Sequence, residues 1–146
     1  MKIRFIKKSE IAAASKIVGL NWDKKDIPLA KREMMAMFNS KVLAPKYLVA
    51  EEKGNIAGIA GYSQSWMDYH VYNIFWVNVH PNYQNRGVGS DLILKILKEI
   101  KSHKGENKAL LILLSTDKPD FYTKFGFKSI KNFEKGKSNL MALELL

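Results

Sequence analysis

The stretch from residue 72 to residue 90, YNIFWVNVHPNYQNRGVGS, decides the fold of this chain. Residues 72–79 are rich in β-branched and aromatic side chains and are largely apolar on both alternating faces, which is typical of a strand near the centre of a sheet. Pro81 ends that strand within a turn. After the glycines, apolar residues recur at helical spacing with charged residues opposite, so we expect a helix that packs one stripe on the sheet. The apolar stripe consists of Leu92, Ile93, Ile96, Leu97 and Ile100.

The turn between strand and helix carries two glycines, Gly87 and Gly89. The first turn of a helix has unpaired N–H groups and a partial positive charge, and glycines let the backbone approach phosphate oxygens closely. A dinucleotide-binding loop requires a third glycine where Leu92 stands. An ATP-binding P-loop requires Lys and then Ser or Thr after the last glycine, whereas Ser90 and Asp91 follow here. Neither pattern fits.

A third pattern does fit: Gln or Arg, two residues, Gly, one residue, then Gly or Ala, matched by Gln84, Gly87 and Gly89. It resembles the acyl-CoA pyrophosphate loop of the GNAT superfamily of N-acetyltransferases. A second motif, FYTKFGF at residues 121–127, follows an apolar strand candidate and is similar to the family's helix-to-strand signature. The resemblance implies an α/β GNAT acyl-CoA N-acyltransferase fold, a mixed, mostly antiparallel sheet with helices on both faces, in one domain spanning residues 1–146.

The residue patterns also predict the order of elements along the chain. We expect Ser9 to cap a helix that runs to about Val18 and stops at Gly19. A second helix follows at 28–38, and Pro119 is well placed to begin a short helix around Phe121. The expected strands are 2–7, 47–52, 56–65, 72–79, 110–115, 127–131 and 140–145.

The family resemblance implies a site and a mechanism. The pantetheine arm of acetyl-CoA, the co-substrate, would lie between the strands at 72–79 and 110–115, and the pyrophosphate would sit on the N–H groups of 86–90. An acceptor amine would attack the thioester directly, with no metal and no covalent enzyme intermediate, and Tyr122 would act as general acid for the thiolate. The residues expected to bind acetyl-CoA are Val77, Asn78, Val79, Gln84, Asn85, Arg86, Gly87, Val88, Gly89 and Ser90.

Purely structural roles would also explain these residues. The two glycines would also suit a tight strand-to-helix turn, and Tyr122 would also suit a buried position in a short helix. Several family members place a glutamate on the central strand as general base, but residues 72–79 contain no carboxylate. The remaining candidates are His80, His70, Asp68, Glu51 and Glu52. This leaves open an α-amine or weakly basic acceptor, a base acting through water, or an acyl-CoA-binding module without turnover.

Acceptor recognition is expected from the first two helices, their connecting loop and the turn at 64–72. Aromatic and acidic side chains gather there and suit a small-molecule or peptide amine, although the two tryptophans would equally suit partly buried core positions. The residues concerned are Trp22, Asp23, Asp26, Trp66, Asp68, Tyr69 and Tyr72.

Composition sets broad limits. The 146 residues carry a formal charge of +10, but the lysines are spread over nearly every expected element and only three arginines are present, so nucleic-acid binding is a weak alternative. There is no cysteine and no long apolar run, which favours a cytoplasmic protein without a membrane span. The apolar last strand leaves both a monomer and a homodimer open.

Overall fold

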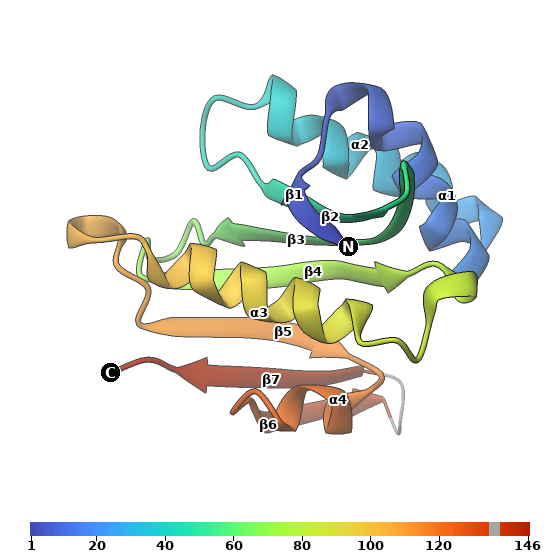
Figure 1. The fold of residues 1–146 in the computed structure, drawn as a ribbon. Helices are drawn as coiled ribbons and strands as arrows, with labels where there is room; N and C mark the ends of the chain where they lie inside the picture. The colour runs from blue at the N-terminus through green and yellow to red at the C-terminus, as the bar shows by residue number, and fades with distance from the viewer. Residues whose placement is uncertain (135–137) are drawn as a thin grey trace.

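Strand β4 (Val71–Val79) lies at the centre of the sheet, as its apolar residues on both faces predict. The computed structural model describes residues 1–134 and 138–146. Within these residues a seven-stranded sheet has the order β1-β2-β3-β4-β5-β7-β6 (Figure 1). The other strands are β1 (Lys2–Phe5), β2 (Lys46–Glu52), β3 (Asn55–Gln64), β5 (Leu111–Thr116), β6 (Lys128–Glu134) and β7 (Ser138–Glu144).

Helices cover both faces of the sheet, as expected (Figure 1). On one face, α1 (Ile11–Asn21) and α2 (Ile27–Asn39) pack against the side chains of Tyr47, Val49 and Ile59. On the other, α3 (Val88–Lys101) and the short α4 (Pro119–Thr123) share a larger core. Short 3-10 turns lie at Lys8–Glu10, Lys24–Asp26, Pro81–Tyr83 and Gly105–Asn107. No helix in the described part of the chain is long and apolar enough to cross a membrane.

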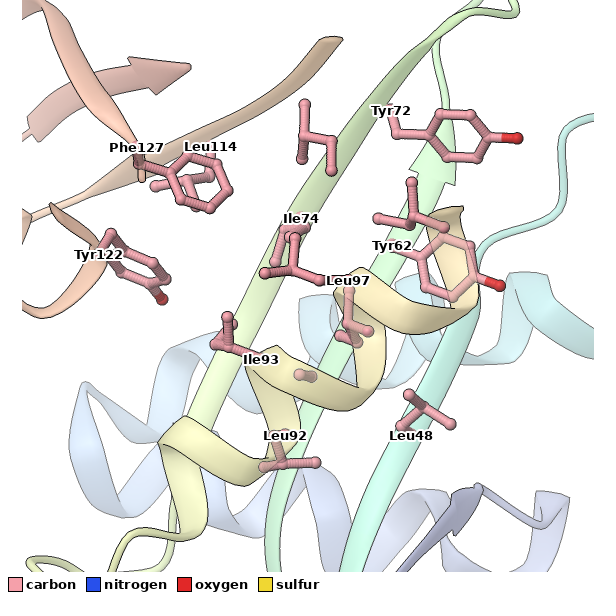
Figure 2. Packing of buried hydrophobic residues seen from close by; sticks show 14 of the residues in the cluster. Leu48, Tyr62, Tyr72, Ile74, Leu92, Ile93, Leu97, Leu114, Tyr122 and Phe127 are labelled. Carbon is pink, nitrogen blue, oxygen red and sulfur yellow. The ribbon is translucent and has the colours of Figure 1, made fainter. Parts of the chain in front are cut away.

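Helix α3 packs its predicted stripe on the sheet. Leu92, Ile93 and Ile96 are fully buried. Figure 2 shows Ile93 and Leu97 directed toward Ile74 of β4. At about 25 cal/mol per Å² of apolar surface, each buried side chain of this kind stabilises the fold by about 1.5–3 kcal/mol. The stripe therefore holds α3 against the face of the sheet that includes β4.

The prediction for the first helix was wrong at both ends. A 3-10 turn precedes α1, and Glu10 accepts hydrogen bonds from the Lys7 N–H and the Arg4 guanidinium, so Ser9 is not the cap. Gly19 lies inside α1, where a Cβ would stand 2.6 Å from the Cδ1 of Ile27. Gly19 therefore lets the start of α2 approach α1, and does not end the helix.

Strands β4 and β5 run parallel but pair over only three residues, from Val71↔Leu111 to Asn73↔Leu113. Every other strand pair is antiparallel, so the sheet is mixed and mostly antiparallel, as expected. Opposite β3, the register of β4 shifts between Ile59 and Gly61, and Trp76 has a positive φ of 49° there. Beyond Asn73 the two parallel strands part, and their separation opens the cleft described next.

Candidate active site

A cleft of about 860 Å³ opens where β4 and β5 separate. Its walls are the second half of β4, the loop and first turn of α3, the end of β5, and α4. The predicted residues that line it are Val77, Asn78, Val79, Gln84, Asn85, Gly87, Val88, Gly89, Ser90 and Tyr122. Arg86 is not among the lining residues, because its guanidinium lies over the Tyr83 ring, 5.5 Å from the centroid. The fold thus gathers the expected set in one place except for the Arg86 side chain.

The start of α3 forms one end of the cleft. Gly87 precedes the helix with φ +82°, a conformation that L side chains rarely adopt. Gly89 faces α4 closely, because a Cβ there would stand 3.3 Å from the Cζ of Phe121. Lys124 donates from Nζ to the Ser90 Oγ at 2.8 Å and lies 4.5 Å from the centroid of the Phe121 ring. The unpaired N–H groups of this helix end and the Lys124 charge together favour an anion.

The end of β4 is tied to α1 by a buried amide. The Oδ1 of Asn78, which is 4% exposed, accepts hydrogen bonds from Asn21 Nδ2 at 3.1 Å and from Trp22 Nε1 at 3.0 Å. The carbonyl of Val79 accepts from Asn21 Nδ2 at 3.0 Å and from Gln84 Nε2 at 3.2 Å. Asn21 was not foreseen at the cleft, since a lone asparagine at a helix end has no distinctive sequence signal.

Tyr122 lies on the α4 side of the cleft. Its ring is buried against Phe121 and Phe127, with centroids 4.9 Å and 6.0 Å away. Figure 2 shows its hydroxyl pointing away from Phe127. Burial, and secondly the negative charge of Asp117, raise the pKa of the Tyr122 phenol well above its ordinary value. The phenol therefore carries its proton at neutral pH.

The five base candidates do not line this cleft. His80 accepts a hydrogen bond from the Asn82 N–H at 3.0 Å, and Glu51 pairs with Arg4. His70 and Asp68 lie in the turn before β4, at the opposite end of that strand, and Glu52 ends β2. The one carboxylate in the cleft lining is Asp117, which the sequence had placed only in the segment between β5 and α4.

The residues expected to bind the acceptor are divided between distant places. Trp22 lines the cleft. Trp66 and Tyr69 belong to the exposed turn between β3 and β4, away from it. Tyr72 is buried in the core under α3, where its hydroxyl donates to the Asn107 carbonyl at 2.7 Å. Asp23 accepts from the Lys25 N–H at 2.9 Å and so caps the turn that ends at Asp26.

A family model described as an acetyltransferase (GNAT) domain matches residues 44–129, which include the cleft from β4 to α4. An L-amino acid N-acyltransferase of Escherichia coli (strain K12) is 28% identical over 112 residues. That alignment covers 69% of this chain and 63% of the relative, so the chain spans less than two thirds of that protein's length.

Solved structures share the fold over nearly the whole chain. An aminoglycoside 6'-N-acetyltransferase complexed with coenzyme A superposes with a TM-score of 0.79 and 17% identity, covering 99% of this chain and 97% of that one. A GNAT family acetyltransferase from Brucella melitensis in complex with acetyl-CoA superposes with a TM-score of 0.72 and 22% identity, covering 98% and 86%. At these low sequence identities, the structural similarity shows that the proteins share a fold.

Proposed function

Because this chain belongs to the GNAT family of acetyltransferases, we propose that it transfers the acetyl group of acetyl-CoA directly to a primary amine of a small molecule or peptide. One observation carries the proposal. The parting of β4 and β5 opens a cleft that runs from an anion-favouring helix start to a buried, protonated tyrosine. Structural relatives have been solved with coenzyme A or acetyl-CoA, which supports the same co-substrate here.

The cleft suggests where acetyl-CoA binds. The pyrophosphate rests on the backbone N–H groups of residues 86–90, so Arg86 contributes its N–H while its guanidinium stays on Tyr83. The pantetheine arm follows the free edge of β4 at Val77 and Asn78, since β5 no longer pairs with the strand there. The Val79 carbonyl already accepts two side-chain hydrogen bonds. Of Val77, Asn78 and Val79, Val79 therefore has the backbone carbonyl that is least available to the pantetheine arm.

The transfer then needs little from the protein beyond position and one proton. The acceptor nitrogen attacks the thioester carbonyl carbon, the C–S bond breaks, and the departing thiolate takes a hydrogen bond or a proton from the Tyr122 hydroxyl, which regains from solvent any proton that it gives up. The proton of the amine passes to water, because β4 carries no carboxylate to receive it. An α-amine, which titrates near 8, loses that proton far more readily than an alkylamine near 10.4. General-acid help is worth about 10²- to 10⁴-fold in rate.

The missing carboxylate on β4 also supports a second candidate function, an acyl-CoA-binding module that does not turn its ligand over. Both functions predict acetyl-CoA binding. They differ in amine-dependent release of coenzyme A.

Isothermal titration with acetyl-CoA, followed by a thiol-release assay over a panel of amines, tests the proposal. Binding with amine-dependent release supports the enzyme, binding without release supports the module, and absence of binding rejects both. Tyr122→Phe should lower turnover by about 10²-fold or more while acetyl-CoA affinity stays within about twofold. Tyr62→Phe is the matched control, because Tyr62 is also buried under α3 but lies outside the cleft lining. Equal turnover of the two variants would remove Tyr122 from the mechanism.

A further inference from the structure

A second cavity, of about 430 Å³, adjoins the cleft and shares Phe75 and Trp76 with it. Its other walls come from α2, the segment before β2, and strands β2 and β3. Apolar and aromatic groups dominate these walls, with Leu43, Pro45 and Tyr47 among them. Among the described residues that line it, Glu33 of α2 is the single charged one. A molecule in this cavity would therefore meet aromatic faces and one carboxylate.

Trp76 forms the wall between the two spaces and is held there in an unusual conformation. Its φ of 49° lies in the left-handed region, which is strained for a bulky residue. The register shift opposite β3 accommodates it, and its indole Nε1 donates to the Glu33 Oε1 at 3.3 Å. Strain of this kind persists where the surroundings enforce it and is concentrated at functional sites. Glu33 and Trp76 are thus one structural unit beside the cleft.

Among the described residues, Glu33 has no cationic partner, although the protein is strongly basic. The chain has 24 lysines and arginines, yet no described lysine or arginine nitrogen lies within 4.0 Å of the Glu33 carboxylate. The side chain is half-buried, and within the described residues its one hydrogen bond comes from the neutral indole of Trp76. Its negative charge acts on the buried Tyr47, whose pKa is raised mainly by burial and further by Glu33. The charge remains available for a ligand.

We propose that Glu33 determines acceptor specificity by binding a second cationic group of the acceptor, an alkylammonium or guanidinium, in this cavity. The inference rests on the proposed acetyl transfer. A carboxylate combined with tryptophan and tyrosine faces suits a cation. The attacking amine must be uncharged to react, so the positive charge that Glu33 binds belongs to the far end of the acceptor. The reacting amine then reaches the cleft past the shared wall of Phe75 and Trp76.

Glu33→Gln isolates the charge, because the amide oxygen can still accept the Trp76 indole hydrogen bond. The substrates are 1,5-diaminopentane and 5-amino-1-pentanol, which differ only in the group far from the reacting amine. We expect the parent to prefer the diamine by about tenfold or more in kcat/KM, and Glu33→Gln to bring this ratio to below about threefold. Glu106→Gln, an equal charge change at an exposed position, is the control that should keep the parent's ratio.

Two kinetic results would overturn the inference. Equal loss of kcat on both substrates, which leaves the ratio unchanged, would place Glu33 in proton transfer and not in selection. An unchanged ratio together with an unchanged kcat would separate Glu33 from the acceptor altogether. If neither amine releases coenzyme A, the proposed transfer fails instead. Direct titration of the two amines into the apoprotein then still tests the cavity. The diamine should bind the parent more tightly than the amino alcohol, and Glu33→Gln should abolish the difference; equal binding in the parent refutes the site.

Discussion

The indole Nε1 of Trp22 donates a hydrogen bond to the Oδ1 of Asn78 over 3.0 Å and so joins the end of α1 to the end of β4. The two residues are 56 positions apart in the chain. Asn78 is 4% exposed, whereas Trp22 is 57% exposed and lines the cleft. A buried amide thus holds an exposed aromatic ring at the cleft. The same Oδ1 accepts from Asn21, so one side chain secures both residues.

Replacing Asn78 with Ala removes the acceptor shared by Asn21 and Trp22. We expect the free energy of unfolding to fall by about 1–3 kcal/mol, because two donors lose their partner and a buried side chain is truncated. Urea unfolding followed by circular dichroism measures the change. Asn73→Ala, on the same strand and without a side-chain hydrogen bond to any described residue, controls for strand propensity. Equal losses in the two variants would show that the Asn78 network contributes no stability.

Substitutions of Gly89 test the anion site at the start of α3. Gly89→Ala places a Cβ about 3.3 Å from Phe121, a close contact that a small ring movement relieves. We expect acetyl-CoA affinity to fall by less than about tenfold, while Gly89→Glu, which adds bulk and negative charge at the proposed pyrophosphate position, should abolish binding. Isothermal titration distinguishes the two. Leu94→Glu adds the same charge on the exposed face of α3 and should bind normally; retained affinity in Gly89→Glu would place the pyrophosphate elsewhere.

Alkaline pH should destabilise the fold through its buried tyrosines. Burial raises the pKa of Tyr62 to about 12, and it raises the pKa values of Tyr47 and Tyr122 further. A phenol whose folded pKa exceeds its unfolded value contributes full stability below about pH 10 and loses it as pH rises through the folded pKa. Urea midpoints measured between pH 8 and 11.5 should therefore fall above pH 10. Tyr62→Phe should lose less stability than the parent over that window; equal slopes would contradict the assignment.

Acid should weaken the connection between β1 and the start of α1. Hydrogen bonds from the Arg4 guanidinium, aided by the Lys7 N–H, lower the pKa of Glu10 to about 2. A lowered pKa means that Glu10 stabilises the fold above its unfolded value near 4.5 and ceases to do so as pH falls through about 2. Glu10→Gln should cost about 1 kcal/mol at pH 7, a modest value because the pair is partly solvated.

The stability difference between Glu10→Gln and the parent should shrink between pH 4.5 and about 2, as measured by urea unfolding at several pH values. Glu106→Gln, exposed and remote from this pair, should show no such convergence. A difference that stays constant from pH 7 to pH 2 would mean that the Glu10 charge is not what stabilises this corner of the fold.

Local patterns were sufficient where one element and its immediate neighbours decide the conformation. The apolar run of β4, the turn at Pro81 and the periodic stripe of α3 all lie where the sequence predicted them. The boundaries of α1 were mispredicted because contacts from outside the helix set them. Glu10 is held by Arg4 on β1, and Gly19 accommodates Ile27 on α2. Neither contact can be recognised from the spacing of the residues around α1.

The sequence by itself determined the family, because two motifs can be recognised from their glycines, their aromatic residues and their order along one chain. It also determined the central strand, the loop after it and the helix that follows. Only the tertiary structure decided where β4 and β5 part, which predicted side chains reach the cleft, and that Glu33 meets Trp76, 43 positions away. The physical reason is the separation along the chain of the residues that interact. Periodicity reports which face of an element is buried, whereas a cleft forms from the register and packing of elements that are far apart along the chain.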